Sequence, residues 1–175
     1  MDLKKYIRSI PDYPKKGILF RDITTLIKDK DAFKECIDQM SKILMKLNFD
    51  KIASIESRGF VFASALCYNM SKSLILMRKK DKLPAERYSQ EFELEYGKAT
   101  LELHKDSITP KEKILIIDDL IATGGTAEAG AKLVEKSNGI VSGFLFVINL
   151  FDLGGRKLLE DKGYKTFSLI DFPGH

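Results

Sequence analysis

Two short runs of consecutive large apolar residues constrain the fold of this chain more than any other feature. They are residues 74–77 (LILM) and residues 114–117 (ILII). A strand with one face in water alternates apolar and polar residues, whereas a strand that is buried on both faces is apolar throughout. The two runs therefore predict strands inside a sheet that is covered on both sides.

The other elements alternate between helix and strand. In residues 29–47 the apolar side chains recur at spacings of three and four residues, which is typical of an amphipathic helix. Helices are predicted at 29–47, 60–70, 127–137 and 154–162, and strands at 51–56, 74–77, 98–104, 114–117, 140–150 and 165–170. Strands that alternate with helices imply a mainly parallel sheet flanked by helices. With no repeat and no linker, we predict one α/β domain spanning residues 1–175.

Charge and composition exclude several classes of function. The net charge is +4, from 29 Lys and Arg against 25 Asp and Glu, and the basic residues are scattered along the chain. Scattered charge gives little support for nucleic-acid binding. No apolar stretch approaches the roughly 18–20 residues that span a bilayer, and the first residues do not form a secretory signal. We expect a soluble, cytoplasmic protein without nucleic-acid or membrane partners.

Cysteine and histidine are too few for the common metal and nucleophile sites. Cys36 and Cys67 both fall in predicted helices, which favours reduced thiols over a disulfide framework. His104 and His175 are the only histidines, so a zinc centre or a Ser–His–Asp triad is poorly supplied. The alternation in 98–104 places His104 on a polar surface face with Thr100 and Glu102.

The segment 114–126 (ILIIDDLIATGGT) carries the chemistry. A buried strand ends in Asp118 and Asp119, and a small Thr/Gly loop, 122–126, leads into a helix. In a parallel sheet this is the carboxyl edge, where ligands bind. Glycines and main-chain N–H groups at a helix N-terminus suit a phosphate, and the two acids suit ribose hydroxyls or hydrated Mg²⁺. The simpler alternative is a helix cap with turn glycines. The segment matches neither a Walker A loop nor G-x-G-x-x-G.

A polar stretch at about 80–97 is too long for a structureless connection in a small domain unless it forms a lid. The flanking strands 74–77 and 98–104 could pair as the hairpin that carries it. Closure of such a lid would exclude water from the site.

Several motifs together resemble a known family. The string 114–126 is similar to the phosphoribosyl-pyrophosphate (PRPP) motif of type I phosphoribosyltransferases. Further segments resemble adenine phosphoribosyltransferases, namely 17–23 (GILFRDI), 56–60 (ESRGF), 82–84 (KLP), 94–97 (LEYG), 149–155 (NLFDLGG) and 172–175 (FPGH). The resemblance covers about residues 8–175 and implies that family's fold. That fold has a mainly parallel sheet, a small N-terminal hood at about 1–30 and a mobile hairpin lid at about 80–97.

The resemblance implies where PRPP would bind. The 5′-phosphate would lie in the loop formed by Ala122, Thr123, Gly124, Gly125 and Thr126. Asp118 and Asp119 would contact the ribose hydroxyls. Ser57 and Arg58 would face the pyrophosphate, next to a non-proline cis peptide at Glu56–Ser57. Lys82 is a further candidate for the pyrophosphate, although Lys79 and Lys82 could equally be solvated.

The resemblance also implies an adenine site and a catalytic acid. Adenine would lie against the ring of Phe20, and main-chain groups of Leu19 and Arg21 would read its edge. Glu95 would handle the proton at the purine ring, and Tyr96 would help to cover the site. On residue type alone, Glu95 would be a solvated acid and Phe20 could be a core aromatic.

The implied reaction joins adenine to PRPP and gives AMP and pyrophosphate in purine salvage, with Mg²⁺ carried by PRPP oxygens and a homodimer as the expected assembly. Hypoxanthine–guanine relatives have an acid where this chain has Ala122, which favours adenine. Asp81 stands where the adenine family often has Gly, so the resemblance does not predict how fast the lid closes.

Three alternatives stay open at this point. A xanthine-specific transferase shares part of the motif set. A PRPP sensor without turnover would usually add a DNA-binding region, for which the first ten residues leave no room. A generic dinucleotide-binding module lacks its glycine fingerprint here.

Overall fold

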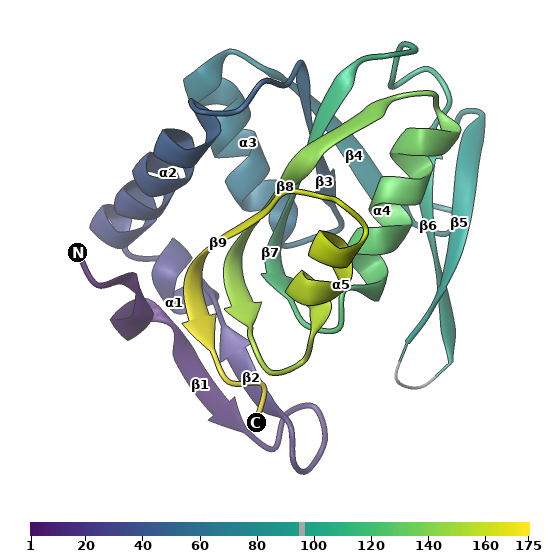
Figure 1. Ribbon diagram of the computed structural model, residues 1–175. Helices are drawn as coiled ribbons and strands as arrows, with labels where there is room; N and C mark the ends of the chain where they lie inside the picture. Colours follow the sequence, from purple (N-terminus) through teal and green to yellow (C-terminus); the bar gives the residue numbers. More distant parts are fainter. Residues whose placement is uncertain (95–96) are drawn as a thin grey trace.

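The computed structural model describes residues 1–94 and 97–175 (Figure 1). Its strands are β1 (Arg8–Pro11), β2 (Leu19–Asp22), β3 (Lys51–Ile55), β4 (Ser73–Lys79), β5 (Arg87–Glu93), β6 (Lys98–His104), β7 (Lys113–Ile121), β8 (Ile140–Leu150) and β9 (Thr166–Phe172). Its helices are the 3-10 turn η1 (Leu3–Tyr6), α1 (Thr24–Ile27), α2 (Lys30–Leu44), α3 (Gly59–Met70), α4 (Gly125–Lys136) and α5 (Gly155–Asp161).

Seven of these strands form one sheet in the order β5-β6-β4-β3-β7-β8-β9. The strands β4, β3, β7, β8 and β9 run parallel, while β6 pairs antiparallel with both β4 and β5. The prediction of a mainly parallel sheet is confirmed. β1 and β2 form a separate antiparallel pair beside the end of β9 (Figure 1).

The central strand β7 explains why helices cover both faces. Leu115 and Ile117 belong to the apolar cluster that includes residues of α2 and α3, whereas Ile114 and Ile116 belong to the cluster that includes residues of α4 and α5. All four side chains are fully buried. Figure 1 shows the two helix pairs on opposite sides of the sheet. Burial on both faces, predicted from the ILII run, is confirmed. The same prediction for residues 74–77 is wrong, because Leu76 is 40% exposed although Ile75 and Met77 are buried.

One arginine holds the N-terminal β1–β2 pair together, and a second ties it to the rest of the chain. Arg8 Nε donates to Asp22 Oδ2 at 3.0 Å, which joins β1 to β2. The buried Arg21 donates from Nη2 to the main-chain oxygen of Pro173 at 2.9 Å, and its guanidinium lies 4.3 Å from the centre of the Phe172 ring. The two chain ends are therefore joined at this corner of the molecule.

Cys36 and Cys67 are free and buried in α2 and α3. Burial raises the pKa of Cys36 to about 12 and that of Cys67 to about 11, so both thiols stay protonated near neutral pH. No helix in the described part of the chain is long and apolar enough to cross a membrane.

Three further local predictions were wrong. Strand β7 does not end at residue 117 but continues to Ile121, because β8 keeps pairing with it. The polar stretch contains a full strand, β5, which was missed because its apolar residues are only Tyr88 and Phe92. The hairpin partner of β6 is therefore β5, and β4 meets β6 only at its last two residues.

The polar face of β6 is also not a surface. Glu102 is 3% exposed and His104 is partly buried. The loop between β4 and β5 covers them, and the main-chain N–H of Ala85 donates to His104 Nε2 at 3.2 Å. Polar and apolar residues do alternate along β6, but its polar side chains contact polar groups of the loop between β4 and β5 and not solvent.

Candidate active site

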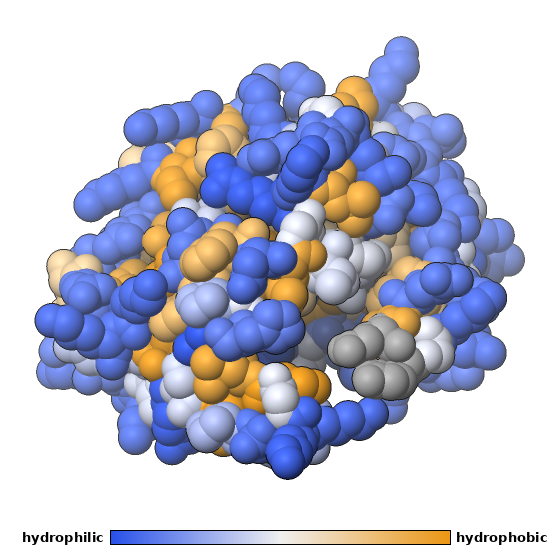
Figure 2. Space-filling view, turned by 60° about the horizontal axis from the view of Figure 1, so that its bottom comes forward, coloured by the Kyte–Doolittle hydropathy of each residue, from blue (hydrophilic) through white to orange (hydrophobic). Residues whose placement is uncertain are grey.

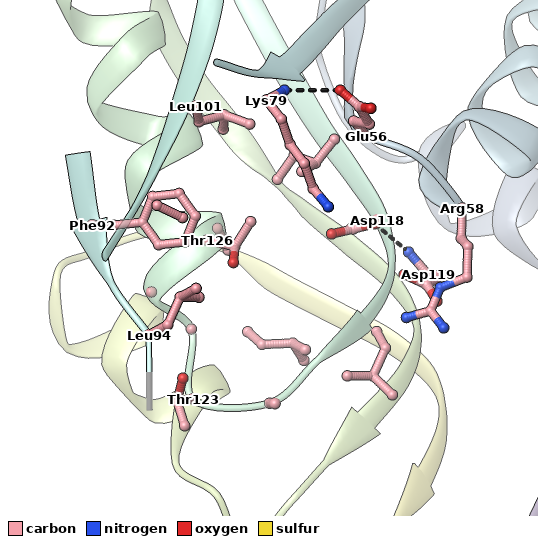
Figure 3. Close-up of a pocket in the computed structure, with 18 of the residues that line it drawn as sticks. Glu56, Arg58, Lys79, Phe92, Leu94, Leu101, Asp118, Asp119, Thr123 and Thr126 are labelled. Atoms are coloured by element: carbon pink, nitrogen blue, oxygen red, sulfur yellow. Dashed lines mark hydrogen bonds and ion pairs between the residues drawn. The ribbon is translucent and has the colours of Figure 1, made fainter. Parts of the chain in front are cut away.

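A cavity of about 450 Å³ opens at the carboxyl ends of the central strands. One wall comes from the ends of β3 and β4, the second from β7 and the loop after it, and the third from the β5–β6 hairpin (Figure 3). The space-filling view from this side shows a hollowed face with both polar and apolar side chains around it (Figure 2). The site is thus open to solvent on one side and built from three separate parts of the chain.

The two acids lie where β7 outruns its neighbour β3. The last registered pair between these strands joins Ser54 to Ile117, whereas β7 and β8 stay paired as far as Ile121. Asp118 and Asp119 therefore lie on a stretch of strand that is held by β8 alone. Because β3 has already turned away, this stretch of β7 is unpaired along one edge, and both acids line the cavity.

The carboxylates of Asp118 and Asp119 lie beside the guanidinium of Arg58. Arg58 Nε is 2.9 Å from Asp119 Oδ2, and the main-chain N–H of Asp119 donates to Asp118 Oδ1 at 2.8 Å. Burial, and then repulsion from Asp119, raises the pKa of Asp118 well above its usual value. A ligand that brings hydrogen-bond donors or positive charge would relieve this repulsion.

Helix α3 begins at Gly59, directly against Asp118. A Cβ at residue 59 would lie 2.7 Å from Asp118 Oδ1 and 2.8 Å from Ser54 Oγ, closer than real Cβ atoms approach such groups. Only glycine permits this contact. The backbone of α3 therefore forms one side of the space that the Asp118 carboxylate occupies.

The turn between β3 and α3 is held by Glu56. Its Oε2 accepts a hydrogen bond from the main-chain N–H of Lys79 at 2.8 Å and lies 3.4 Å from Arg78 Nε. Partial burial opposes ionisation, but these contacts outweigh it and lower the pKa of Glu56. The Glu56–Ser57 peptide is cis, as the resemblance implies. With Glu56 anchored, Ser57 and Arg58 are left exposed at the rim of the cavity.

The loop 122–126 runs along the second wall and opens α4. Gly124 has φ 90° and caps the helix, which starts at Gly125. A Cβ on Gly124 would lie 3.0 Å from the Cα of Gly155, and the N–H of Gly155 donates to the Ala122 oxygen at 2.9 Å, so the loop packs backbone to backbone on α5. The first N–H groups of a helix have no partner within it, and the positive end of its dipole attracts anions. The predicted phosphate loop has the backbone this requires.

The hairpin closes the third side. Phe92 and Leu94 lie next to Thr126 and Thr123 of the loop (Figure 3). A Cβ on Gly125 would be only 3.3 Å from the main-chain oxygen of Glu93, so the end of β5 touches the start of α4. The hairpin therefore rests against the anion-binding end of the helix.

Comparison with known proteins identifies the family. Residues 23–173 match the model of the phosphoribosyl transferase domain. A Pelagibacter ubique protein named adenine phosphoribosyltransferase is 67% identical over the whole length of both chains. The chain belongs to the adenine phosphoribosyltransferase family. Among solved structures, the adenine phosphoribosyltransferase of Thermoanaerobacter pseudethanolicus superposes with a TM-score of 0.94 at 48% identity, covering 98% of both chains. The enzyme of Saccharomyces cerevisiae, solved with adenine and an imino-altritol bisphosphate, gives 0.89 at 32% identity over 97% of both.

The residues predicted to bind adenine lie outside the described lining of this cavity. Leu19, Phe20 and Arg21 belong to β2 and are not among the described residues that line it. Phe20 is nevertheless near, because the Arg58 guanidinium lies 5.3 Å from the centre of its ring. Arg58 thus bridges Asp119 and the predicted base platform. A role in adenine binding stays a prediction for all three residues.

The structure brings Lys79 to the cavity, whereas the sequence alone left open whether this side chain is merely solvated. Lys79 is the last residue of β4, and its side chain points into the cavity toward Asp118 (Figure 3). Lys79 follows an apolar strand, as the two acids do, and this position in the sequence could have predicted that it reaches the cavity. Lys82 is exposed on the loop after β4 and is not among the described lining residues. Glu95 and Tyr96 lie outside the described residues, so their predicted roles stay predictions.

The close approach of α3 to Asp118 can be tested with Gly59→Ala. The new Cβ must displace the Asp118 carboxylate, so we expect PRPP to bind roughly tenfold more weakly, about 1.4 kcal/mol. Overpacking should also cost about 1–3 kcal/mol in the free energy of unfolding. Calorimetric titration with PRPP and urea denaturation measure the two effects.

Gly130→Ala inside α4 is the matched control. Its Cβ would lie 3.3 Å from the sulfur of Met77, the end of a flexible side chain, so PRPP affinity should not change. An unchanged affinity in Gly59→Ala as well would contradict the proposed importance of this contact.

Proposed function

We propose that this protein transfers the 5-phosphoribosyl group from PRPP to adenine, giving AMP and pyrophosphate in purine salvage. The observation that carries the proposal is the cavity formed by Asp118, Asp119 and the loop 122–126, in a chain 67% identical to a named adenine phosphoribosyltransferase. The protein would act as a glycosyltransferase at the anomeric carbon of the ribose.

PRPP would lie along the second wall of the cavity. The N–H groups at the start of α4, with the hydroxyls of Thr123 and Thr126, would bind the 5′-phosphate. Asp118 and Asp119 would accept hydrogen bonds from the ribose hydroxyls, which removes the repulsion between the two acids without adding negative charge. Each charge-assisted bond contributes about 1.5–3 kcal/mol.

The pyrophosphate would then face the first wall. Ser57 and Arg58 lie at its rim, and Lys79 points in from β4. Because Arg58 is paired with Asp119, the arriving pyrophosphate would compete for its guanidinium while the ribose takes over the acid. Lys82 could join only if the loop after β4 moves.

Adenine would enter between the rim and β2. The Phe20 ring would support the face of the base, with main-chain groups of Leu19 and Arg21 at its edge. Ala122 carries no acid that could pair with an oxopurine. The adenine seen in the Saccharomyces cerevisiae structure belongs to that relative and supports this choice.

The reaction is a displacement in which the bond to pyrophosphate breaks early and positive charge develops on the ribose ring. Asp118 and Asp119 lie where this charge would form, so their electrostatic stabilisation would be the main contribution of the chain. The hairpin wall would keep water from the ribosyl carbon. Glu95 would manage the proton of the purine ring.

Mg²⁺ would enter this site bound to PRPP. The described residues contain no cluster of three or more metal-ligating side chains. Mg²⁺ usually binds substrate phosphates and waters with only one or two carboxylates. PRPP oxygens would carry it here, close to Asp118 and Asp119, which would bind the ribose hydroxyls. Bound in this way, it would neutralise charge on the departing pyrophosphate.

A homodimer in the cytoplasm is the proposed state of the protein. Val61 and Tyr68, about two helical turns apart on α3, are 40% and 92% exposed, and Leu76 on β4 is 40% exposed. Such apolar groups are what a second copy would cover.

Base choice is the first test. Pyrophosphate release should be measured from PRPP and Mg²⁺ with adenine, hypoxanthine, guanine or xanthine supplied separately. We expect turnover with adenine alone, since Ala122 offers no partner for an oxopurine. Turnover with an oxopurine would overturn the base assignment, and PRPP binding without any turnover would favour a sensor.

The role of Glu95 is tested by Glu95→Gln, which keeps the shape and removes the proton acceptor. We expect kcat to fall by about 10²–10⁴, the usual contribution of acid–base catalysis. Glu93→Gln, at an exposed position two residues earlier, is the control and should leave kcat unchanged. An unchanged kcat in Glu95→Gln would rule the role out.

Assembly is tested by light scattering. The wild-type mass should be about twice the 19.8 kDa of one chain, and Leu76→Lys should shift the population toward monomer because it places a charge in the proposed contact. A monomeric wild-type protein would contradict the dimer.

A further inference from the structure

A buried carboxylate lies where the β5–β6 hairpin joins the main sheet. Among the described residues, β4 and β6 are registered only at Arg78–Glu102 and Lys79–Leu101. On its other side, Glu102 is registered with Ser89 of β5. The side chain of Glu102 is 4% exposed. The hairpin is thus joined to the sheet by a narrow seam with this acid at its centre.

Three groups from two other segments, β5 and the loop after β4, balance the charge of Glu102. Its Oε1 accepts a hydrogen bond from Ser89 Oγ at 3.1 Å. Its Oε2 accepts one from the main-chain N–H of Asp81 at 3.0 Å and lies 3.1 Å from Arg87 Nε. One carboxylate therefore holds β6, β5 and the loop after β4 together.

Arg87 extends this network into the loop. Its Nη1 donates to the main-chain oxygen of Leu83 at 3.1 Å, and its Nη2 donates to Asp81 Oδ1 at 3.2 Å. Asp81 itself has φ 63°, and Leu83 is buried. The loop 80–86 is thus folded back over Glu102 and covers it.

The network lies directly behind the third wall of the cavity. Thr100 and Leu101, next to Glu102 on β6, line the cavity, and Phe92 of β5 reaches the start of α4. The hairpin also packs on α4, where Lys136 Nζ donates to the main-chain oxygen of Ser89 at 2.7 Å, and on the apolar core through Leu101 and Leu103. The contacts of Glu102 are therefore one of the ties that set how closely Phe92 and Leu94 approach the loop 122–126.

We propose that Glu102 is a positioning residue that fixes the hairpin against the phosphate loop. It touches no substrate and acts through Ser89, Arg87 and the main chain of Asp81. Without its charge, Arg87 would be left partly buried beside a neutral group, which costs more than a surface pair. The hairpin would then sample positions in which its wall stands away from bound PRPP. This inference rests on the proposed function in one respect, because the KM for PRPP can be measured only if the protein has the proposed activity.

The test is Glu102→Gln, compared with Glu112→Gln. Glu112 also accepts a main-chain hydrogen bond, from Thr109 at 2.8 Å, and lies 2.9 Å from Lys51 Nζ, but it precedes β7 at the end opposite the cavity. We expect both variants to lose some thermal stability. Only Glu102→Gln should raise the KM for PRPP, by about tenfold, corresponding to 1.4 kcal/mol.

Hydrogen exchange in the protein without substrates gives a second readout. Amides of β5, Arg87–Glu93, should exchange faster in Glu102→Gln and at the wild-type rate in Glu112→Gln. If the wild type shows no turnover at all, the proposed function fails, and the exchange rates still decide whether Glu102 anchors the hairpin. Unchanged exchange and unchanged KM in Glu102→Gln would overturn the inference.

Ser89→Ala is the milder variant if Glu102→Gln does not fold. It removes one of the three contacts and leaves the ion pair with Arg87 intact. We expect the KM for PRPP to rise in the same direction but less, with kcat for bound substrates little changed. A KM equal to that of the wild type would count against the proposal.

Discussion

The unequal lengths of two neighbouring strands create the site of this protein. Main-chain pairing with β8 keeps β7 extended as far as Ile121, while β3 stops at Ile55 and turns into α3. The stretch that outruns β3 carries Asp118 and Asp119, and the glycine at the start of α3 lets the helix backbone close in on them. The positions of the loop 122–126, of the two acids and of the rim at Ser57 and Arg58 all depend on this difference in strand length.

The site needs negative charge for hydroxyl groups and positive charge for a phosphate, and these two charges are kept apart along β7 and the loop after it. The acids and the anion-binding loop are separated by the end of β7, on the order of 10 Å for a few extended residues. A sugar phosphate spans such a length, with its hydroxyls at one end and its phosphate at the other. Arg58 and Lys79 supply positive charge on the side away from the loop. Charge along the wall of β7 is therefore ordered as the proposed binding of PRPP would require.

Sequence reasoning predicted the parts of the fold that depend on local patterns. The ILII run specified a strand with two buried faces, and the Thr/Gly string specified a strand, loop and helix in that order. It failed where a distant segment supplied the partner. Glu102 alternates like a surface residue, and only Ser89, Arg87 and the folded-back loop make it a buried one. The length of β7 likewise depended on β8, and Lys79 reached the cavity through the register of β4, which the sequence does not state.

The contact between Gly124 and Gly155 has a consequence for anyone who wishes to redesign this pocket. The phosphate loop leans on the first residue of α5 with no side chain between the two backbones. Residues 122–126 therefore cannot be changed independently of the start of α5. A library that randomises them while keeping residues 153–158 constant would mostly sample clashes, whereas one that varies both segments together could move the floor of the pocket as a unit.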